Sequence, residues 1–211
     1  MAAETIHTAR DADGLAALIA RAAEEAGRRS DGSARGLPPV ERWNPPFCGD
    51  IDMEIRADGR WFYMGTPIGR PALVRLFSTV LRKDEDGHTY LVTPVEKVRI
   101  KVEDAHFLGV EMTAGERDGG PVLTLRTNVG DVVEVGSEHR LRFLIEGEHR
   151  QLKPYVLVRG RLDALLSRAV MYELIERGEV IDVEGVPMFA LRSGGAIFPV
   201  MPADELDQLS Q

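Results

Sequence analysis

The chain has 211 residues, of which 44% are hydrophobic and 28% are charged. This is ordinary globular usage, which excludes a disordered or collagen-like chain, and the length suits one large domain or two small ones. The 26 Lys and Arg against 34 Asp and Glu give a formal net charge of -8. Because a negative field repels nucleic acid backbones and anionic lipid heads, we expect neither as a partner.

The single cysteine, Cys48, excludes an internal disulfide and a metal site built from several thiolates, and it is typical of a reducing compartment. Met1–Arg10 lacks the basic start and apolar run of a secretory signal. No apolar stretch approaches the roughly 18 residues of a membrane span. We therefore predict a cytoplasmic protein with no membrane span.

The N-terminal region predicts one helix followed by an extended arm. Apolar residues from Asp13 to Gly27 recur at the spacing of one helical face. The segment Arg28–Pro46 is rich in Gly and Pro, which block helix and sheet, so it predicts an arm over the surface. We expect Trp43 to hold this arm against the body.

The next segment predicts a hairpin and a helix. Asp50–Ile55 alternates apolar and polar residues, Ala57–Gly59 supplies a turn, and Arg60–Met64 reads as a second strand. A helix then carries apolar residues from Leu73 to Leu81. We expect a polar turn over Lys83–Gly87 to end it.

The rest of the chain is predicted to be mostly strand. Strands are expected at His88–Val92, Lys97–Val102, His106–Met112, Val122–Arg126, Val132–Val135, Leu141–Ile145, Tyr155–Val158, Val180–Val183, Met188–Leu191 and Ala196–Val200. The apolar spacing from Leu162 to Leu174 predicts a second helix after Tyr155–Val158. Met201–Gln211 is expected to be a polar, frayed tail.

A strand followed by a helix and further strands occurs twice, which indicates an internal duplication. Phe62, Leu76 and Val80 align with Val156, Val170 and Leu174, although the match is one of apolar pattern and not of identity. We therefore predict an α+β fold of two related strand-helix-sheet units. The expected division is 1–46 for the helix and arm, 47–104 and 105–200 for the two units, and 201–211 for the tail.

Four groups of residues are candidates for sites of chemistry. Asp50, Asp52 and Glu54 share one strand face and would suit a hard cation, although a solvated strand face explains them as well. The loop Gly65–Arg70 before a helix would suit an anion, but a plain turn is the simpler interpretation. The five histidines show no metal-ligand spacing, and Cys48 reads as a small buried thiol. We predict no metal, cofactor or catalytic residue.

Arg168 and Tyr172 belong to the second predicted helix. Arg168 lies near the apolar face of that helix, where an unpaired cation is costly. We therefore expect it to have a carboxylate, a carbonyl or a ligand as its partner. A structural ion pair and a ligand contact both fit, so these two residues join the candidate ligand-binding set.

Several short strings in order make the chain similar to one family. They include Pro38-Pro39-Val40-Glu41-x-Trp43, Asp52-Met53-x-Ile55, Asp58-Gly59-x-Trp61, Thr66-Pro67-Ile68-x-Arg70, Leu73-Val74-x-Leu76-Phe77, Tyr90-Leu91-Val92-Thr93-Pro94-Val95-Glu96-Lys97, Thr127-Asn128-Val129-Gly130-Asp131 and Tyr155-x-x-Val158-Arg159. Together they resemble the bacterial family of domain of unknown function 1285, from about Pro38 to Val200.

This resemblance implies two related α+β units, the second superficially like pleckstrin-homology domains. It also implies a ligand- or partner-binding site at the interface of the two units and a role in signal transduction, with no established activity. The candidate ligand-binding residues that it supplies are Asp52, Arg70, Thr93, Glu96, Lys97, Asn128 and Arg159.

The sequence thus leaves three functional hypotheses open. The first is a non-catalytic module that binds an unidentified small molecule or protein segment. The second is a cation-dependent enzyme that uses Asp50, Asp52 and Glu54. The third is a structural adaptor that binds partners through exposed strand edges.

Overall fold

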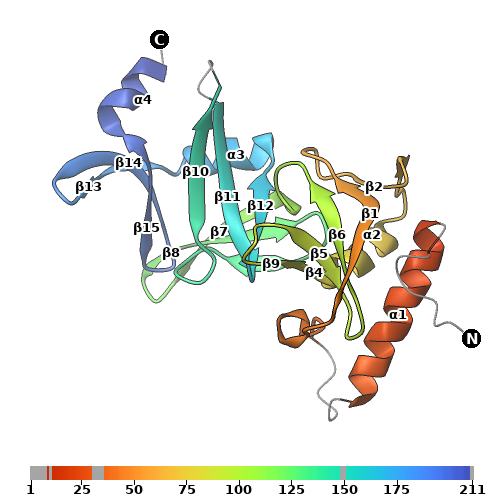
Figure 1. The fold of residues 1–211 in the computed structure, drawn as a ribbon. Coiled ribbons are helices and arrows are strands. Elements are labelled where there is room, and N and C mark those ends of the chain that lie inside the picture. The colour runs from red at the N-terminus through yellow and green to blue at the C-terminus, as the bar shows by residue number, and fades with distance from the viewer. Residues whose placement is uncertain (1–8, 10, 30–35, 148–150, 210–211) are drawn as a thin grey trace, which may run out of the picture. The chain divides into compact units, whose positions relative to one another are not determined.

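The computed structural model describes residues 9, 11–29, 36–147 and 151–209, which form two compact units (Figure 1). The N-terminal unit comprises residues 1–106 and 160–162, and the C-terminal unit comprises residues 107–159 and 163–211. Residues 1–8 and 10, where the sequence predicts no secretory signal, lie outside the described residues. So do residues 30–35 of the predicted arm. No helix in the described parts of the chain combines the length and apolar character needed to cross a bilayer.

The N-terminal unit is built on a six-stranded sheet. Its strands are β1 (Phe47–Ile55), β2 (Trp61–Tyr63), β3 (Thr66–Pro67), β4 (Leu81–Lys83), β5 (Thr89–Val92) and β6 (Lys97–Val102). They lie in the order β3-β2-β1-β6-β5-β4, with β1 parallel to β6 and the other pairs antiparallel.

Two α-helices complete this unit. Helix α2 (Pro71–Thr79) buries Phe77, whose ring stacks on Trp61 of β2 with centroids 6.4 Å apart. Helix α1 (Ala12–Arg29) buries Leu15 and Ile19 and contacts α2. Apolar residues at helical spacing therefore bury one face of each helix, as the sequence predicts.

The arm is held against the sheet by one buried arginine. Its described part contains the short 3-10 helix η2 (Val40–Arg42). Arg82 of β4 donates from Nη1 to the carbonyl oxygens of Val40 and Trp43, each at 2.7 Å. The backbone of Trp43 therefore takes part in holding the arm.

The C-terminal unit contains a second six-stranded sheet. Its strands are β7 (Phe107–Arg117), β8 (Gly120–Thr127), β9 (Val132–Glu134), β10 (Leu141–Glu146), β11 (Gln151–Arg159) and β12 (Leu162–Leu166), in the order β10-β11-β12-β7-β8-β9. Strands β12 and β7 are parallel. Helix α3 (Arg168–Ile175) follows β12 and contacts β7.

The two sheets have the same topology. With the strands of each sheet numbered in chain order, both read 3-2-1-6-5-4, and the first and sixth strands are parallel in both. The fold is thus α+β with two similar sheets. The predicted alignment of Phe62 with Val156 is wrong, however, because the second strand, β2, corresponds to β8 and not to β11. Helix α2 follows the third strand whereas α3 follows the sixth, so matching the helices shifted the alignment.

The predicted second helix begins too early. Leu162–Leu166 is strand β12, in which Leu162, Ala164 and Leu166 are buried in alternation. The apolar positions of this segment fit both the period of two of a strand and the period of 3.6 of a helix. Their spacing therefore does not distinguish strand from helix here. The boundary is Ser167, whose Oγ caps α3 by accepting a hydrogen bond from the backbone N–H of Val170.

Two further predicted elements differ from the structure. Helix α2 ends at Thr79, and Leu81–Lys83 forms β4, so the predicted turn begins one residue after Lys83. The predicted frayed tail instead starts within β15, where Met201 is buried, and continues into helix α4 (Ala203–Leu209). Residues 210–211 lie outside the described chain. The polar sequence of α4 concealed a helix whose backbone contacts β14 and β15.

A small third sheet is joined to the second one through Ser193. It contains β13 (Glu179–Val183), β14 (Val186–Ser193) and β15 (Ala196–Pro202). The buried Ser193 Oγ donates to the Val135 carbonyl at 2.7 Å and accepts from the Leu123 amide at 2.9 Å. Next to it Gly194 has φ +56° and would place a Cβ 2.7 Å from the Val135 oxygen, so only glycine fits there.

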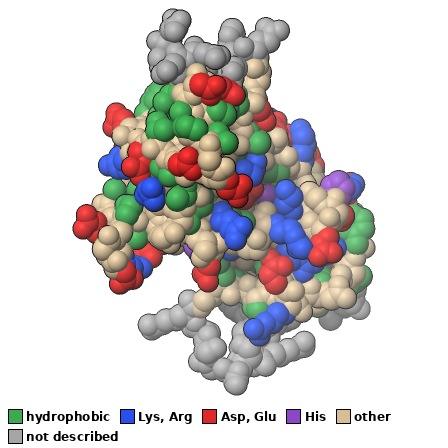
Figure 2. Space-filling view, turned by 90° about the vertical axis from the view of Figure 1, so that its left-hand side faces the viewer, with side chains coloured by type: hydrophobic (Ala, Val, Ile, Leu, Met, Phe, Trp, Pro, Cys, Tyr) green, Lys and Arg blue, Asp and Glu red, His purple; other side chains and the backbone are tan. Residues whose placement is uncertain are grey.

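The third sheet also exposes apolar side chains. Val180, Val186 and Ile197 are 59%, 49% and 41% exposed. Figure 2 looks at the side on which β13, β14 and α4 lie in Figure 1, and hydrophobic side chains gather in the upper part of that face. Charged side chains of both signs are interspersed over the rest of it.

Candidate functional site

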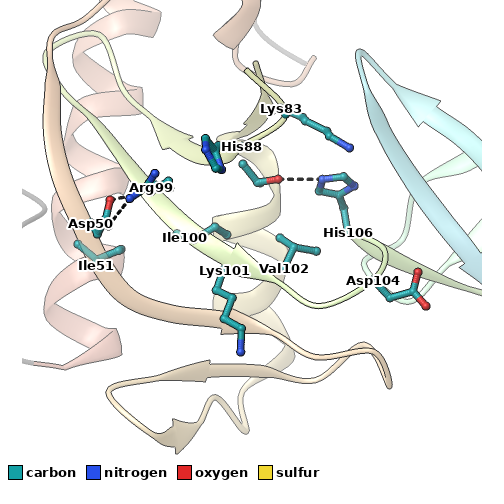
Figure 3. A pocket seen from close by; sticks show the side chains of 12 residues that line it. Asp50, Ile51, Lys83, His88, Arg99, Ile100, Lys101, Val102, Asp104 and His106 are labelled. Carbon is teal, nitrogen blue, oxygen red and sulfur yellow. Dashed lines mark hydrogen bonds and ion pairs between the residues drawn. The ribbon is translucent and has the colours of Figure 1, made fainter. Parts of the chain in front are cut away.

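A groove of about 390 Å³ lies at one end of the N-terminal sheet (Figure 3). The last pair between β5 and β6 is Thr89 with Ile100, so Lys101 and Val102 continue past the start of β5. On the other side of β6, Asp50 of β1 pairs with Arg99 and Glu54 pairs with Lys101. Four residues of β1 therefore span the same length as two residues of β6, which is a β-bulge. The groove is lined by Asp50, Ile51, Lys83, Gly87, His88, Thr89, Arg99, Ile100, Lys101, Val102, Asp104 and His106. We call it the β6 groove.

Two cations of the β6 groove are held in ion pairs. Arg99 donates from Nε and Nη2 to the two carboxylate oxygens of Asp50 at 2.8 and 2.5 Å, drawn in Figure 3. The hydrogen bond from Arg99 lowers the pKa of Asp50. Lys101 donates to Glu54 at 2.6 Å, a bond that raises the pKa of Lys101. These pairs fix the side chains at the edge of the groove.

Lys83 differs from these two cations. It lies half-buried at the end of β4, and among the described residues its ammonium has no hydrogen bond or ion pair. In Figure 3 it points toward the side of the groove where His106 lies. The exposed His88 lines the same groove. Lys83 is therefore an uncompensated positive charge beside two imidazoles.

The floor of the groove contains a hydrogen bond between two buried side chains. Thr89 and His106 are 5% and 4% exposed, and Thr89 Oγ1 lies 3.0 Å from His106 Nε2. The pair connects β5 to the last residue of the N-terminal unit. It therefore fixes the position of the imidazole at the wall of the groove.

Replacing Thr89 by Val is expected to lower the free energy of unfolding by about 1–3 kcal/mol. Valine keeps the shape of threonine, but it leaves His106 Nε2 without its hydroxyl partner in a buried position. Urea unfolding monitored by circular dichroism measures the change. A loss below about 0.5 kcal/mol, the range of a neutral surface change, would show that this bond does not hold the floor.

A structural ion network outside the groove lining joins side chains of β4, β5 and β6. Arg82 and Lys97 both bond to Asp84, at 2.6 and 2.7 Å, and Lys97 also lies over the Tyr90 ring. Tyr90 donates to Asp86 at 2.6 Å. Burial first and this bond second raise the pKa of Tyr90 to about 12. The sequence-predicted ligand residue Lys97 therefore lies in this network and not in the β6 groove.

The other predicted residues of the N-terminal unit are also separated from the groove. Arg70 forms an ion pair with Asp13 of α1, and the exposed Asp52 has a backbone carbonyl that accepts from the Met64 amide. Thr93 is 1% exposed, and its hydroxyl accepts from the Glu96 amide and donates to the Glu96 carbonyl. Thr93 and Glu96 thus form a buried turn between β5 and β6.

Asn128 and Arg159 lie in the C-terminal unit. Asn128 Oδ1 accepts from the Leu108 amide at 3.0 Å, and Arg159 forms an ion pair with Asp131 over the ring of Phe107. These contacts attach the β8–β9 turn to β7 and β11. Both residues have structural partners, and their predicted ligand role stays a prediction.

Replacing Arg159 by Ala is expected to lower the free energy of unfolding by about 1–2 kcal/mol, because it removes a partly buried ion pair and a cation–π contact. Chemical unfolding of the variant measures this loss. A matched Arg192→Ala variant removes an exposed pair with Glu179 and is expected to cost less than about 1 kcal/mol. Equal losses for the two variants would contradict the structural role of Arg159.

The sequence predicts Arg168 near the apolar face of its helix, and this prediction is wrong. The residue is exposed at the start of α3, and its Nε donates to the Tyr172 hydroxyl at 2.9 Å. The helix begins after Leu166 and not at Leu162, which turns Arg168 toward solvent. The two predicted residues are thus brought together by i,i+4 spacing, without a described cavity between them.

Two of the three carboxylates of β1 are bound by cations. Asp50 bonds to Arg99 and Glu54 bonds to Lys101, whose hydrogen bond lowers the pKa of Glu54. Within the described residues no three His, Cys, Asp or Glu side chains form a group that would hold a metal ion. The carboxylates that the enzyme hypothesis needs therefore serve mainly as ion-pair partners.

A larger hollow of about 610 Å³ lies in the C-terminal unit, beside the edge strand β9. Gly136, Gly194 and Gly195 contribute to its wall. The charges of Arg117 and Glu134, which also line it, neutralise each other in an ion pair. Lys83 gives the smaller β6 groove an uncompensated charge, so the β6 groove is the stronger candidate.

Sequence reasoning missed the residues of the β6 groove. Lys83 was assigned to a turn, and His88, Arg99, Lys101 and His106 were interpreted as ordinary strand positions. They line one groove because β4 pairs with β5 and β5 pairs with β6, and the parallel pairing of β1 with β6 adds Asp50 from a distant part of the chain. The one local signal was the alternation of Lys97, Arg99 and Lys101, which places three cations on one strand face.

The geometry defines an α+β protein of two repeated units with a small polar groove in the first. Family models match both: the N-terminal domain of DUF1285, a domain of unknown function, matches residues 38–105, and the DUF1285 C-terminal domain matches residues 106–200. The chain belongs to the DUF1285 family.

Two solved structures are similar to the chain. A DUF1285 family protein from Silicibacter pomeroyi DSS-3 is 45% identical, with a TM-score of 0.76 over 87% of this chain and 97% of that one. A DUF1285 family protein from Shewanella baltica OS155 is 28% identical, with a TM-score of 0.47 over 59% of this chain and 90% of that one. No curated protein matches the chain.

Proposed function

We propose that this protein is a non-catalytic binding module that takes a small polar molecule into the β6 groove. The observation that carries the proposal is the half-buried Lys83, whose ammonium has no partner among the described residues, in a groove that the exposed His88 also lines. The volume of about 390 Å³ falls in the range of small-molecule sites. A half-buried charge without a partner gains free energy from a ligand of opposite charge, which favours binding.

The chemistry of the groove supports binding over catalysis. Thr89 and His106 have the spacing of a nucleophile and its base, but each is at least 95% buried and presents little surface to a substrate. Asp50 is engaged by Arg99 through both of its oxygens. The cation-dependent enzyme stays a hypothesis. The ion pairs of Asp50 and Glu54 argue against it, because they occupy carboxylates that would bind the cation.

We propose that this module acts in signal transduction, as the resemblance to the bacterial family implies, and that it lies in the cytoplasm. The single cysteine supports a reducing compartment. The ligand site expected between the two units stays a prediction. The adaptor hypothesis also stays a prediction, since the exposed Val180 and Val186 identify no partner.

Native mass spectrometry of protein purified gently from its own cells tests the proposed function. We expect a mass excess of small-molecule size over the denatured chain. Replacing Ile51, a half-buried wall residue, by Trp should fill the groove and abolish the excess. Replacing the exposed Val180 of β13 by Trp is the matched control and should leave it unchanged.

Two results would reject the proposed function. One is the absence of any mass excess in the wild-type protein. The other is an excess that the Ile51→Trp variant retains in full while remaining folded by circular dichroism.

A further inference from the structure

We infer that the edge strand β9 of the C-terminal unit binds an extended, basic peptide segment of a partner protein, which it adds to the sheet as a further strand. This docking site is separate from the β6 groove and does not depend on the proposed function. The unpaired backbone edge of β9, the hollow beside it and the charge of that hollow carry the inference.

One edge of β9 has no neighbouring strand. Within the described residues, β9 is the last strand of its sheet and pairs only with β8. Just after β9, the Val135 amide donates to the Leu123 carbonyl of β8 at 2.8 Å. Because backbone groups alternate between the two sides of an antiparallel strand, those of Val132 and Glu134 point away from β8. Such an edge is a template for the backbone of another chain.

The hollow of about 610 Å³ beside β9, which we call the β9 groove, offers room for an added strand. All of its lining residues belong to the C-terminal unit. Val132 and Glu134 both line it, so the unpaired edge borders open space. Gly136, Gly194 and Gly195 form part of the wall, and their lack of side chains lets another backbone approach closely.

The burial of β9 indicates which side chains the added strand would carry. Val132 and Glu134 are exposed, whereas Val133 between them is 5% exposed. An added strand continues the same pleat, so alternate side chains lie beside Val133 and the others lie on the solvent side. Apolar residues suit the first set, and polar residues suit the second.

The charge of the β9 groove selects basic residues for the solvent side. Arg117 and Glu134 neutralise each other. Asp118 and Glu138 are exposed, and their carboxylates have no hydrogen bond or ion pair among the described residues. The formal net charge of -8 on the whole chain has the same sign as these two carboxylates. Both the groove and the chain therefore attract lysine or arginine and repel acidic residues.

The β9 edge of a second copy of this chain is a poorer occupant. Two β9 strands placed side by side would bring Glu134 and Glu138 of one copy near the same residues of the other. Like charges on neighbouring strands are destabilising. The charge therefore favours a basic segment of a different protein.

Isothermal titration calorimetry of the full chain with a capped peptide of alternating lysine and valine tests the inference. A peptide of alternating glutamate and valine is the control for charge. A lysine-valine peptide that is methylated at every backbone nitrogen keeps the charge but has no N–H to donate. We expect the unmodified lysine-valine peptide to bind, and each control to bind at least about ten-fold more weakly.

Two proline variants locate the site. Val132→Pro removes an N–H that points away from β8, and proline is tolerated at the first residue of a strand. It should raise Kd by about ten-fold or more, because it removes a donor to the peptide and places a ring at the edge. Val180→Pro makes the same change in β13, an edge strand of the third sheet, and should leave Kd unchanged.

A charge variant tests the groove without changing β9. Glu138→Lys reverses one exposed charge of the lining. It should raise Kd by about five-fold or more at low ionic strength, and the difference from wild type should shrink in high salt. An unchanged Kd in this variant would contradict the basic character of the partner.

The remaining outcomes also decide the inference. It is overturned if the wild-type chain does not bind the lysine-valine peptide, or if the methylated peptide binds as tightly as the unmodified one. An unchanged Kd in a folded Val132→Pro variant, or an equal rise in Val180→Pro, would overturn the assignment to β9. If Val132→Pro loses its circular dichroism signal, the methylated peptide and Glu138→Lys decide the outcome.

Discussion

Replacing Arg82 by Met is expected to lower the free energy of unfolding by about 3 kcal/mol, the cost of breaking a buried charged hydrogen-bond network. Arg82 is 8% exposed, and it bonds to the Asp84 carboxylate and to the carbonyls of Val40 and Trp43. Methionine fills much of the same space but leaves these acceptors without their donor. Urea unfolding of the purified variant measures the loss.

The adjacent lysine provides the control for this variant. Side chains alternate along a strand, so Lys83 lies on the opposite face of β4 from Arg82 and lines the β6 groove. We expect Lys83→Met to change the free energy of unfolding by less than about 0.5 kcal/mol. Equal losses in the two variants would contradict the division of β4 into a structural face and a binding face.

The arm gives a second readout of the Arg82 variant. Loss of the two carbonyl contacts should increase hydrogen exchange and proteolysis over residues 40–43 before the sheet unfolds. An arm that stays protected in Arg82→Met would show that other contacts hold it.

Asp84→Asn is expected to lower the free energy of unfolding by about 2 kcal/mol at neutral pH, because Arg82 and Lys97 both lose their charged partner. Burial acts to raise the pKa of Asp84, but the hydrogen bonds from Arg82 and Lys97 outweigh it and hold the pKa below 3.8. The carboxylate is therefore more stable in the folded chain than in the unfolded one.

This lowered pKa sets the direction of the pH dependence. The stabilisation by Asp84 is fully present above the unfolded pKa of about 3.9 and is lost as the pH falls through the lower folded pKa. The difference in unfolding free energy between wild type and Asp84→Asn should be constant above about pH 5 and shrink below about pH 4. Urea unfolding at several pH values measures it, and a difference that persists unchanged into acid would contradict the assignment.

The sequence predicts much of the fold because its local patterns are clear. The spacing of Leu15 and Ile19 predicts α1, and the alternation of Lys97–Val102 predicts β6 with its observed bounds. The failures have a common cause. At Leu162–Leu166 apolar residues fit both helix and strand, and Leu81 continues the apolar spacing of the preceding helix. Pairing with a neighbouring strand decides which structure forms at each place.

The candidate site was harder to predict than the fold. Thr93, Glu96 and Lys97 fall in matching strings, but they form a buried turn and an ion network. The polar residues of such strings include structural ones, and the sequence does not show which carboxylate neutralises which cation. The structure pairs Arg82 and Lys97 with Asp84, Arg99 with Asp50 and Lys101 with Glu54. Lys83 has no such partner among the described residues, and the sequence alone does not show this difference.

Hydrogen exchange tests most directly whether the β6 groove binds a natural ligand, because it needs no knowledge of ligand class. The comparison is between protein purified gently from its own cells and the same protein stripped of small molecules by unfolding and refolding. We expect slower exchange in the unstripped protein at residues 83–89 and 99–104, which surround the groove. Equal exchange in both samples, or protection confined to the C-terminal unit, would contradict binding at this groove.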